Sequence, residues 1–273
     1  MKKASFLLVA VTLLAFTMPV LAQDSANPDA VVSENTNSVA FNNFGFSYDS
    51  ALGSILTIET LTGDAPDVQQ PGGPVPPHTL HALYHPSADG ASVNPDFAPI
   101  SIRLYHTADL AQYPMQAAAL SQLQSLLTDR PDLSIFTIAP ADISQPFPSL
   151  PMLNSVPAAQ TIIAQPKYVT TSGFSGIAYI TAYRSDVSPF MNNSFIYTFQ
   201  GISEDGALAV SAWFDLTTLL FPEILPDTFD YNAFATDYLN YLHQSVEILS
   251  NASPDDFSPS LTILDTLIAS LSD

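Results

Sequence analysis

Two arginines stand out because the chain has few cations and both fall within apolar runs. Arg103 lies in one expected strand, and Arg184 shares the face of another with Ile180 and Ala182. A guanidinium in such a place must pair with an acid or bind an anion, because a buried unpaired charge is costly. Two interpretations follow: an internal ion pair, the commoner arrangement, or capture of a carboxylate-bearing ligand.

Three large aromatic residues form a second candidate group. Tyr179 and Tyr183 share one face of an expected strand, and Trp213 lies on the opposite face of another strand from Val210. Such rings could line a groove, although packing against a covering helix is the commoner role. The candidate ligand-binding residues are therefore Arg103, Arg184, Tyr179, Tyr183 and Trp213.

Histidines are concentrated at His78, His81 and His85, with His106 further along the chain. Zinc requires several imidazoles to converge within a few ångströms. On a strand, His81 and His85 would lie about 13 Å apart, and His78 would point to the other face. The pattern indicates ordinary surface or loop histidines, so we expect no metal site and no cofactor.

Residues 173–176 read Gly-Phe-Ser-Gly and partly match the nucleophile elbow of serine hydrolases. That motif needs a second glycine at the position of Ile177 and a helix after it, whereas a strand is expected here. The segment indicates a hairpin turn. Catalytic residues stay unknown, and a hydrolase would need a nucleophile and a base from separate parts of the chain.

The first 22 residues have the three parts of a secretory signal peptide. Lys2 and Lys3 precede an apolar run, and Val20-Leu21-Ala22 ends in a small residue suited to cleavage. The apolar run is shorter than the roughly 20 residues of a membrane span. We therefore expect a secreted or periplasmic protein, a flexible polar leader over residues 23–38, and a single domain over residues 39–273.

Acidic residues dominate the expected mature chain. After cleavage, the chain would carry 26 acidic residues and four Lys or Arg residues, which gives a formal charge of −22. Such a surface repels phosphate backbones and anionic lipids, so we expect no nucleic-acid partner and no membrane partner. The chain has no cysteine, so packing rather than disulfides must stabilise it.

The pattern of the chain favours an α+β fold. Residues 51–61, 78–84 and 99–105 predict strands, and residues 161–183 and 194–214 predict two hairpins, the second around Asp205-Gly206. Proline-rich stretches at residues 62–77 and 131–157 predict long loops, the second wrapping the surface. The chain therefore predicts an antiparallel sheet of about six to eight strands.

Helices are expected in the middle and at the end. Pro114 suits a first helical position, and the Ala/Leu/Gln-rich run to Leu127 follows it. Near the C-terminus, residues 235–249 place apolar side chains at helical spacing, and residues 261–271 do so again. One middle helix and two C-terminal helices should therefore pack on the sheet.

Two segments resemble known families. Residues 195–213, FIYTFQGISEDGALAVSAW, resemble a hairpin motif of uncharacterised exported bacterial proteins: an aromatic strand ending in Gln-Gly, then Asp-Gly and a return strand. Residues 44–48, FGFSY, resemble the opening of PsbP-like and Mog1-like α+β domains. The resemblances imply an exported α+β protein and assign no catalytic residue.

Three functions are compatible with these features. The first is a non-catalytic domain that binds a small molecule or another component of the cell envelope. The second is an extracytoplasmic hydrolase with dispersed catalytic residues. The third, a cation-dependent surface module, depends only on the acidity. The absence of a complete catalytic motif favours the first.

Overall fold

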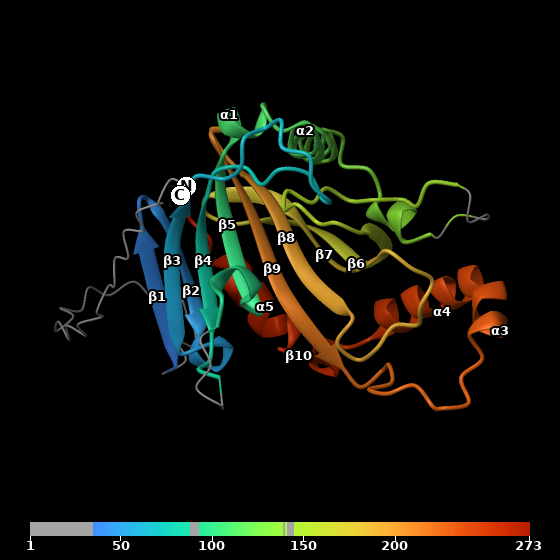
Figure 1. Ribbon diagram of the computed structural model, residues 1–273. Helices are drawn as coiled ribbons and strands as arrows, with labels where there is room; N and C mark the ends of the chain where they lie inside the picture. The colour runs from blue at the N-terminus through green and yellow to red at the C-terminus, as the bar shows by residue number, and fades with distance from the viewer. Residues whose placement is uncertain (1–34, 88–92, 139, 141–144) are drawn as a thin grey trace, which may run out of the picture. The chain divides into compact units, whose positions relative to one another are not determined.

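An eight-stranded sheet forms the centre of the fold (Figure 1). Its strands follow the order β3-β4-β5-β9-β8-β7-β6, β10 pairs with β9, and every pairing is antiparallel. The strand bounds are β3 Ile55–Leu61, β4 His78–Tyr84, β5 Ile100–His106, β6 Ala159–Thr170, β7 Phe174–Arg184, β8 Phe195–Ser203, β9 Leu208–Thr218 and β10 Phe257–Ser258. A separate hairpin joins β1 (Thr36–Phe41) to β2 (Phe44–Asp49).

The computed structural model describes residues 35–87, 93–138, 140 and 145–273. The expected signal peptide and residues 23–34 of the expected leader lie outside these residues. The last residues of the expected leader, 36–38, are part of β1 and pair with β2. All described residues belong to one unit, Ser33–Asp273. Within them, we find no helix with the length and apolar character that crossing a membrane requires.

Both hairpins predicted in the second half of the chain are confirmed. β6 pairs with β7 and β8 pairs with β9, and Gly206 adopts the positive φ that the tight turn after Asp205 requires. The long-range pairing of β5 with β9 joins them to the N-terminal strands.

One face of the sheet is covered by C-terminal helices and the β1–β2 hairpin. Leu242, Val246 and Leu249 of α4 (Tyr238–Asn251) join the core there, as do Leu264 and Ile268 of α5 (Leu261–Ala269). The expected stripe over residues 235–249 is not one helix, because it is interrupted at Asp237 between α3 (Tyr231–Thr236) and α4.

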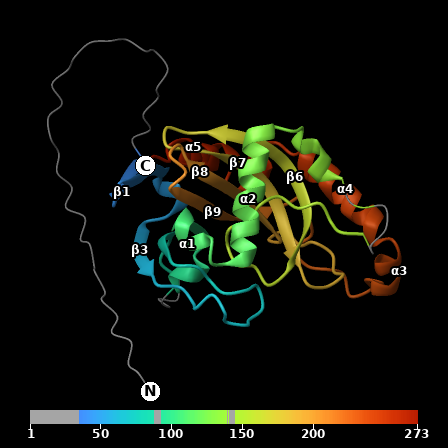
Figure 2. The same cartoon turned by 90° about the horizontal axis from the view of Figure 1, so that it is seen from above.

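The middle helix covers the opposite face (Figure 2). This helix, α2 (Pro114–Asp129), begins at Pro114 as expected and buries Leu120, Leu123 and Leu126 against β7 and β8. The short helix α1 (Thr107–Leu110) precedes it. The prediction of an α+β fold with one middle helix and two C-terminal helices is therefore confirmed.

The second proline-rich segment differs from its prediction. Residues 150–157, which we name the strap, lie across the sheet on the α2 side, and Leu150 and Leu153 are buried there. Prolines keep this segment out of regular structure, but they do not keep it on the surface. Part of the strap therefore packs in the core between α2 and the sheet, where polar side chains of the strands supply hydrogen-bond partners for its backbone.

Candidate ligand-binding pocket

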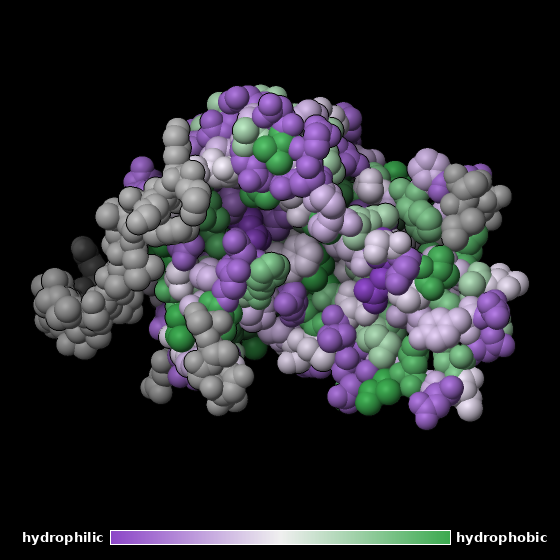
Figure 3. Space-filling view, in the orientation of Figure 1, coloured by the Kyte–Doolittle hydropathy of each residue, from purple (hydrophilic) through white to green (hydrophobic). Residues whose placement is uncertain are grey.

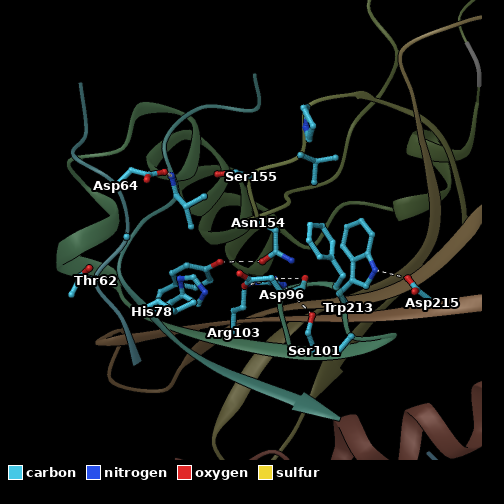
Figure 4. A pocket seen from close by; sticks show the side chains of 18 residues that line it. Thr62, Asp64, His78, Asp96, Ser101, Arg103, Asn154, Ser155, Trp213 and Asp215 are labelled. Carbon is cyan, nitrogen blue, oxygen red and sulfur yellow. Dashed lines mark hydrogen bonds and ion pairs between the residues drawn. The ribbon is translucent and has the colours of Figure 1, made fainter. Parts of the chain in front are cut away.

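A pocket of about 800 Å³ opens on the α2 side of the sheet, over β4, β5 and β9 (Figure 4). The strap forms one wall, and the start of the loop at residues 62–77 forms another. The short turn Pro95–Phe97 closes a third side. This volume falls within the range of small-molecule sites. In the space-filling view, the hollow has strongly hydrophilic residues at its floor (Figure 3).

The strap is held in place by side chains from four strands. Gln160 of β6 and Gln200 of β8 accept the N–H groups of Leu150 and Leu153 at 2.8 and 3.0 Å. The hydroxyl groups of Tyr179 on β7 and Tyr105 on β5 donate to the carbonyl of Pro151 and the side-chain oxygen of Asn154. We name the four strand residues the polar ladder: Gln160, Tyr179, Gln200 and Tyr105. It fixes the strap wall in one position.

The loop wall is fixed in a similar way. One carboxylate oxygen of Asp64 accepts the backbone N–H of Val75 at 2.9 Å and the side-chain amide of Gln70 at 2.8 Å. The hydroxyl of Tyr113 donates to the Asp64 carbonyl, and Ser155 of the strap donates to the Pro74 carbonyl. The two walls are therefore tied to each other and to the start of α2, so the cavity is preformed.

Arg103 lies on the floor of the pocket, with its side chain 15% exposed. Its guanidinium donates to Ser101 Oγ at 2.9 Å and to the Asp96 carbonyl at 3.3 Å. The Asp96 carboxylate is 3.9 Å away and its side chain is 52% exposed, so this ion pair is loose. Arg103 therefore combines the two interpretations of the sequence: it has an internal counterion, and it faces a cavity.

His78 borders the same floor from β4 and is only 5% exposed. Its Nδ1 lies 2.8 Å from the Pro76 carbonyl, so this nitrogen carries the proton in the neutral ring. Nε2 is buried and has no hydrogen-bond partner among the described residues. Burial lowers the pKa of His78, and the neighbouring Arg103 lowers it further, whereas the hydrogen bond to the Pro76 carbonyl raises it. The ring therefore presents an acceptor.

Trp213 forms the far end of the pocket on β9. Its Nε1–H donates to Asp215 at 2.7 Å, and the ring of Tyr183 stacks on it with centroids 6.1 Å apart. Burial raises the pKa of the Asp215 carboxyl, while the Trp213 hydrogen bond opposes that shift. Tyr183 thus supports Trp213 from outside the pocket, and Trp213 itself faces the cavity.

The candidate residues from the sequence therefore separate into groups. Arg103 and Trp213 line the pocket, Tyr183 supports Trp213, and Tyr179 is fully buried in the polar ladder. Arg184 lies away from the pocket, where its guanidinium donates to Ser194 and stacks over a phenylalanine ring.

The expectation of surface histidines was wrong for two positions. His78 and His81 are 5% and 1% exposed, because the loop of residues 62–77 covers one face of β4 and the β1–β2 hairpin covers the other. His85 is exposed and lies 3.1 Å from the Ala51 carbonyl. No cluster of three or more metal-ligating side chains occurs among the residues that the structure describes.

Comparison with known proteins found no matching family model, no matching curated protein and no matching solved structure.

Sequence reasoning missed Asp96, Asn154 and Asp215 as pocket residues. Each comes from a different part of the chain, and only the β5–β9 pairing and the strap bring them together. One signal was available: Ser101, Arg103 and Tyr105 alternate with apolar residues on a single strand, which places three polar groups on one face.

Proposed function

We propose that this chain is an exported, non-catalytic domain that binds a small molecule in the pocket over β4, β5 and β9. The observation that carries the proposal is a preformed cavity with a charged side chain, Arg103, on its floor. Hydrogen bonds within the chain hold both walls, so little conformational entropy is lost on binding.

The hydrogen bonds in the pocket favour binding over hydrolysis. Acyl transfer by a serine needs a hydroxyl paired with a base. Ser155 donates its hydroxyl to the Pro74 carbonyl, and Ser101 Oγ accepts from Arg103. Nε2 of His78 has no partner in the described part of the chain, so neither serine is paired with it.

A panel of small solutes tests the binding function. We would screen neutral sugars, sugar acids, amino acids and short aliphatic acids by thermal shift and by the fluorescence of Trp213, the single tryptophan of the chain. We expect at least one class to raise the melting temperature and change the fluorescence. Val156→Phe should abolish the response, because Val156 lines the pocket.

Val187→Phe is the matched control, since Val187 is 42% exposed and lies outside the pocket. It should leave the response unchanged. If no class binds the wild-type protein, or if V156F responds as the wild type does, the proposed function is wrong.

Export is tested separately, by intact mass spectrometry of protein recovered outside the cytoplasm. The proposal rests on the basic start, the apolar run and the small residue at Ala22. We expect a mass that lacks residues 1–22. A natural product that retains them would contradict export by a cleaved signal.

A further inference from the structure

The polar groups of the pocket select among ligand classes, and this inference rests on the proposed binding function. One cation, Arg103, lines the cavity together with three acids, Asp64, Asp96 and Asp215. Asp64 is already held by two N–H donors of its own loop, Asp96 lies beside Arg103, and Asp215 lies next to Trp213 (Figure 4).

Arg103 has donors to offer. A guanidinium carries five N–H groups, and hydrogen bonds to Ser101 and to the Asp96 carbonyl use two of them within the described residues. The distance of 3.9 Å to the Asp96 carboxylate leaves room for a closer partner. Because guanidinium groups bind carboxylates through paired hydrogen bonds, a ligand carboxylate fits this position.

The surrounding acids limit the charge of that ligand. Asp96 and Asp215 would repel a second negative group, and the pocket has no other Lys or Arg among its described lining residues. A single carboxylate matches the one guanidinium, whereas a phosphate ester with nearly two charges does not. The site therefore favours a monoanion.

His78 requires a donor from the ligand. Its Nε2 is an acceptor with no partner in the described structure, on a ring that is 5% exposed. A buried acceptor without a partner costs free energy until a ligand satisfies it. The ring lies beside Arg103, close enough for the guanidinium to act on it. A hydroxyl group near the ligand carboxylate would satisfy Nε2.

Trp213 adds an apolar surface opposite these polar groups. One side of the indole is covered by Tyr183, and the residue lines the cavity. Aromatic faces of this kind pack against the C–H face of a ring while polar neighbours bind its edge. The carboxylates of Asp96 and Asp215 can accept hydrogen bonds from hydroxyl groups on that edge.

We propose that the pocket binds a sugar acid: a hydroxylated ring with one carboxylate, of the hexuronate type. Its carboxylate is bound by Arg103, a hydroxyl donates to His78 Nε2, and one ring face lies against Trp213. Neutral sugars lack the group that Arg103 binds, so they should bind more weakly.

Calorimetric titration with four monosaccharides tests the assignment: D-glucuronate and D-galacturonate against D-glucose and D-galactose. Each acid differs from its neutral partner in the group on C5, so the ratio of their affinities reports the carboxylate contact. We expect at least one acid to bind about tenfold or more tightly than its neutral partner, the size of a charge-assisted hydrogen bond. Arg103→Gln should remove this preference.

Arg184→Gln is the matched control. It removes the same charge from a position away from the pocket, so it should keep the preference for the acid. His78→Phe keeps a ring beside Tyr105 and should weaken a uronate and its neutral partner by a similar factor, about five- to tenfold. Melting curves confirm that each variant is folded, and the affinity ratio within one variant does not depend on its stability.

Three results would overturn the sugar-acid assignment and leave the binding function standing. The first is equal affinity for the acid and its neutral partner, and the second is an unchanged preference for the acid in R103Q. The third is that only another class of solute binds the wild-type protein, with V156F abolishing that binding. If no solute binds the wild-type protein, the binding function fails as well.

Discussion

Acid should destabilise this fold through His81, a residue outside the pocket. His81 is 1% exposed, and its ring lies 5.0 Å from the ring centroid of Phe44 and 5.8 Å from that of Phe46. Neither ring nitrogen has a hydrogen-bond partner among the described residues. Burial lowers the pKa of His81 to about 4, although the backbone of Ile102 favours the charged ring.

The size of the effect follows from linkage. In the unfolded chain the imidazole has its ordinary pKa of about 6.5, so between that value and the folded pKa of about 4 the unfolded state binds one more proton. The contribution of neutral His81 to the free energy of unfolding is therefore fully present above about pH 6.5 and is lost as the pH is lowered. The loss amounts to about 3 kcal/mol over the whole window, of which about 2 kcal/mol falls between pH 7 and pH 4.5.

His81→Leu isolates this contribution from the titration of the many carboxyl groups. Urea unfolding at about pH 7 and pH 4.5 should show that the wild type loses about 2 kcal/mol more than the variant. At neutral pH the variant should be at least as stable, because it buries no unpartnered nitrogen. His243→Gln, at an exposed position, should behave as the wild type. Equal losses in the wild type and H81L would refute the reasoning.

Three further predictions concern stability. Gln200→Leu should cost about 2–4 kcal/mol in urea unfolding, because it leaves the Leu153 N–H unpartnered; a loss below about 1 kcal/mol would contradict a structural role for the polar ladder. Lys167→Met should change stability by less than about 1 kcal/mol, because its ion pair with Asp265 is exposed. Tyr197→Phe removes a buried donor to the same carboxylate and should cost about 1–2 kcal/mol. Similar values for the two variants would contradict this ranking. Raising sodium chloride from about 10 to 150 mM should raise the melting temperature by about 2–4 °C if screening of the acidic surface contributes about 1 kcal/mol, and a flat or falling curve would count against such repulsion.

Local patterns were sufficient for most elements of the fold. The start of α2 follows from Pro114, and the β8–β9 hairpin from Asp205-Gly206, because these signals act over a few residues. The β1–β2 hairpin was not predicted, although the expected domain begins within it, at residue 39. Its turn residues, Asn42 and Asn43, both have positive φ, a signal that asparagine can provide.

The site required contacts that no local pattern contains. Arg103 and Trp213 were recognised as unusual, yet their proximity depends on β5 pairing with β9 across about a hundred residues of chain. Asp96 and Asn154 come from irregular segments whose positions depend on that pairing and on the strap. A sequence can therefore show that a strand face is polar without showing which distant segments enclose it.

Polar residues in the central strands carry information that an apolar pattern does not. Gln200 and Ser211 are fully buried in the middle of the sheet and hydrogen-bond to each other. A covering helix would leave the side-chain oxygen of Gln200 without a donor, because the backbone N–H groups of a helix are already bonded. Only an irregular segment has free N–H and carbonyl groups to offer, so such residues indicate where one crosses the sheet. The strap supplies such groups along its path from β6 to β5. The pocket begins where the polar ladder ends, at Tyr105. The same polarity that excludes a helix from this part of the sheet therefore leaves space for a ligand.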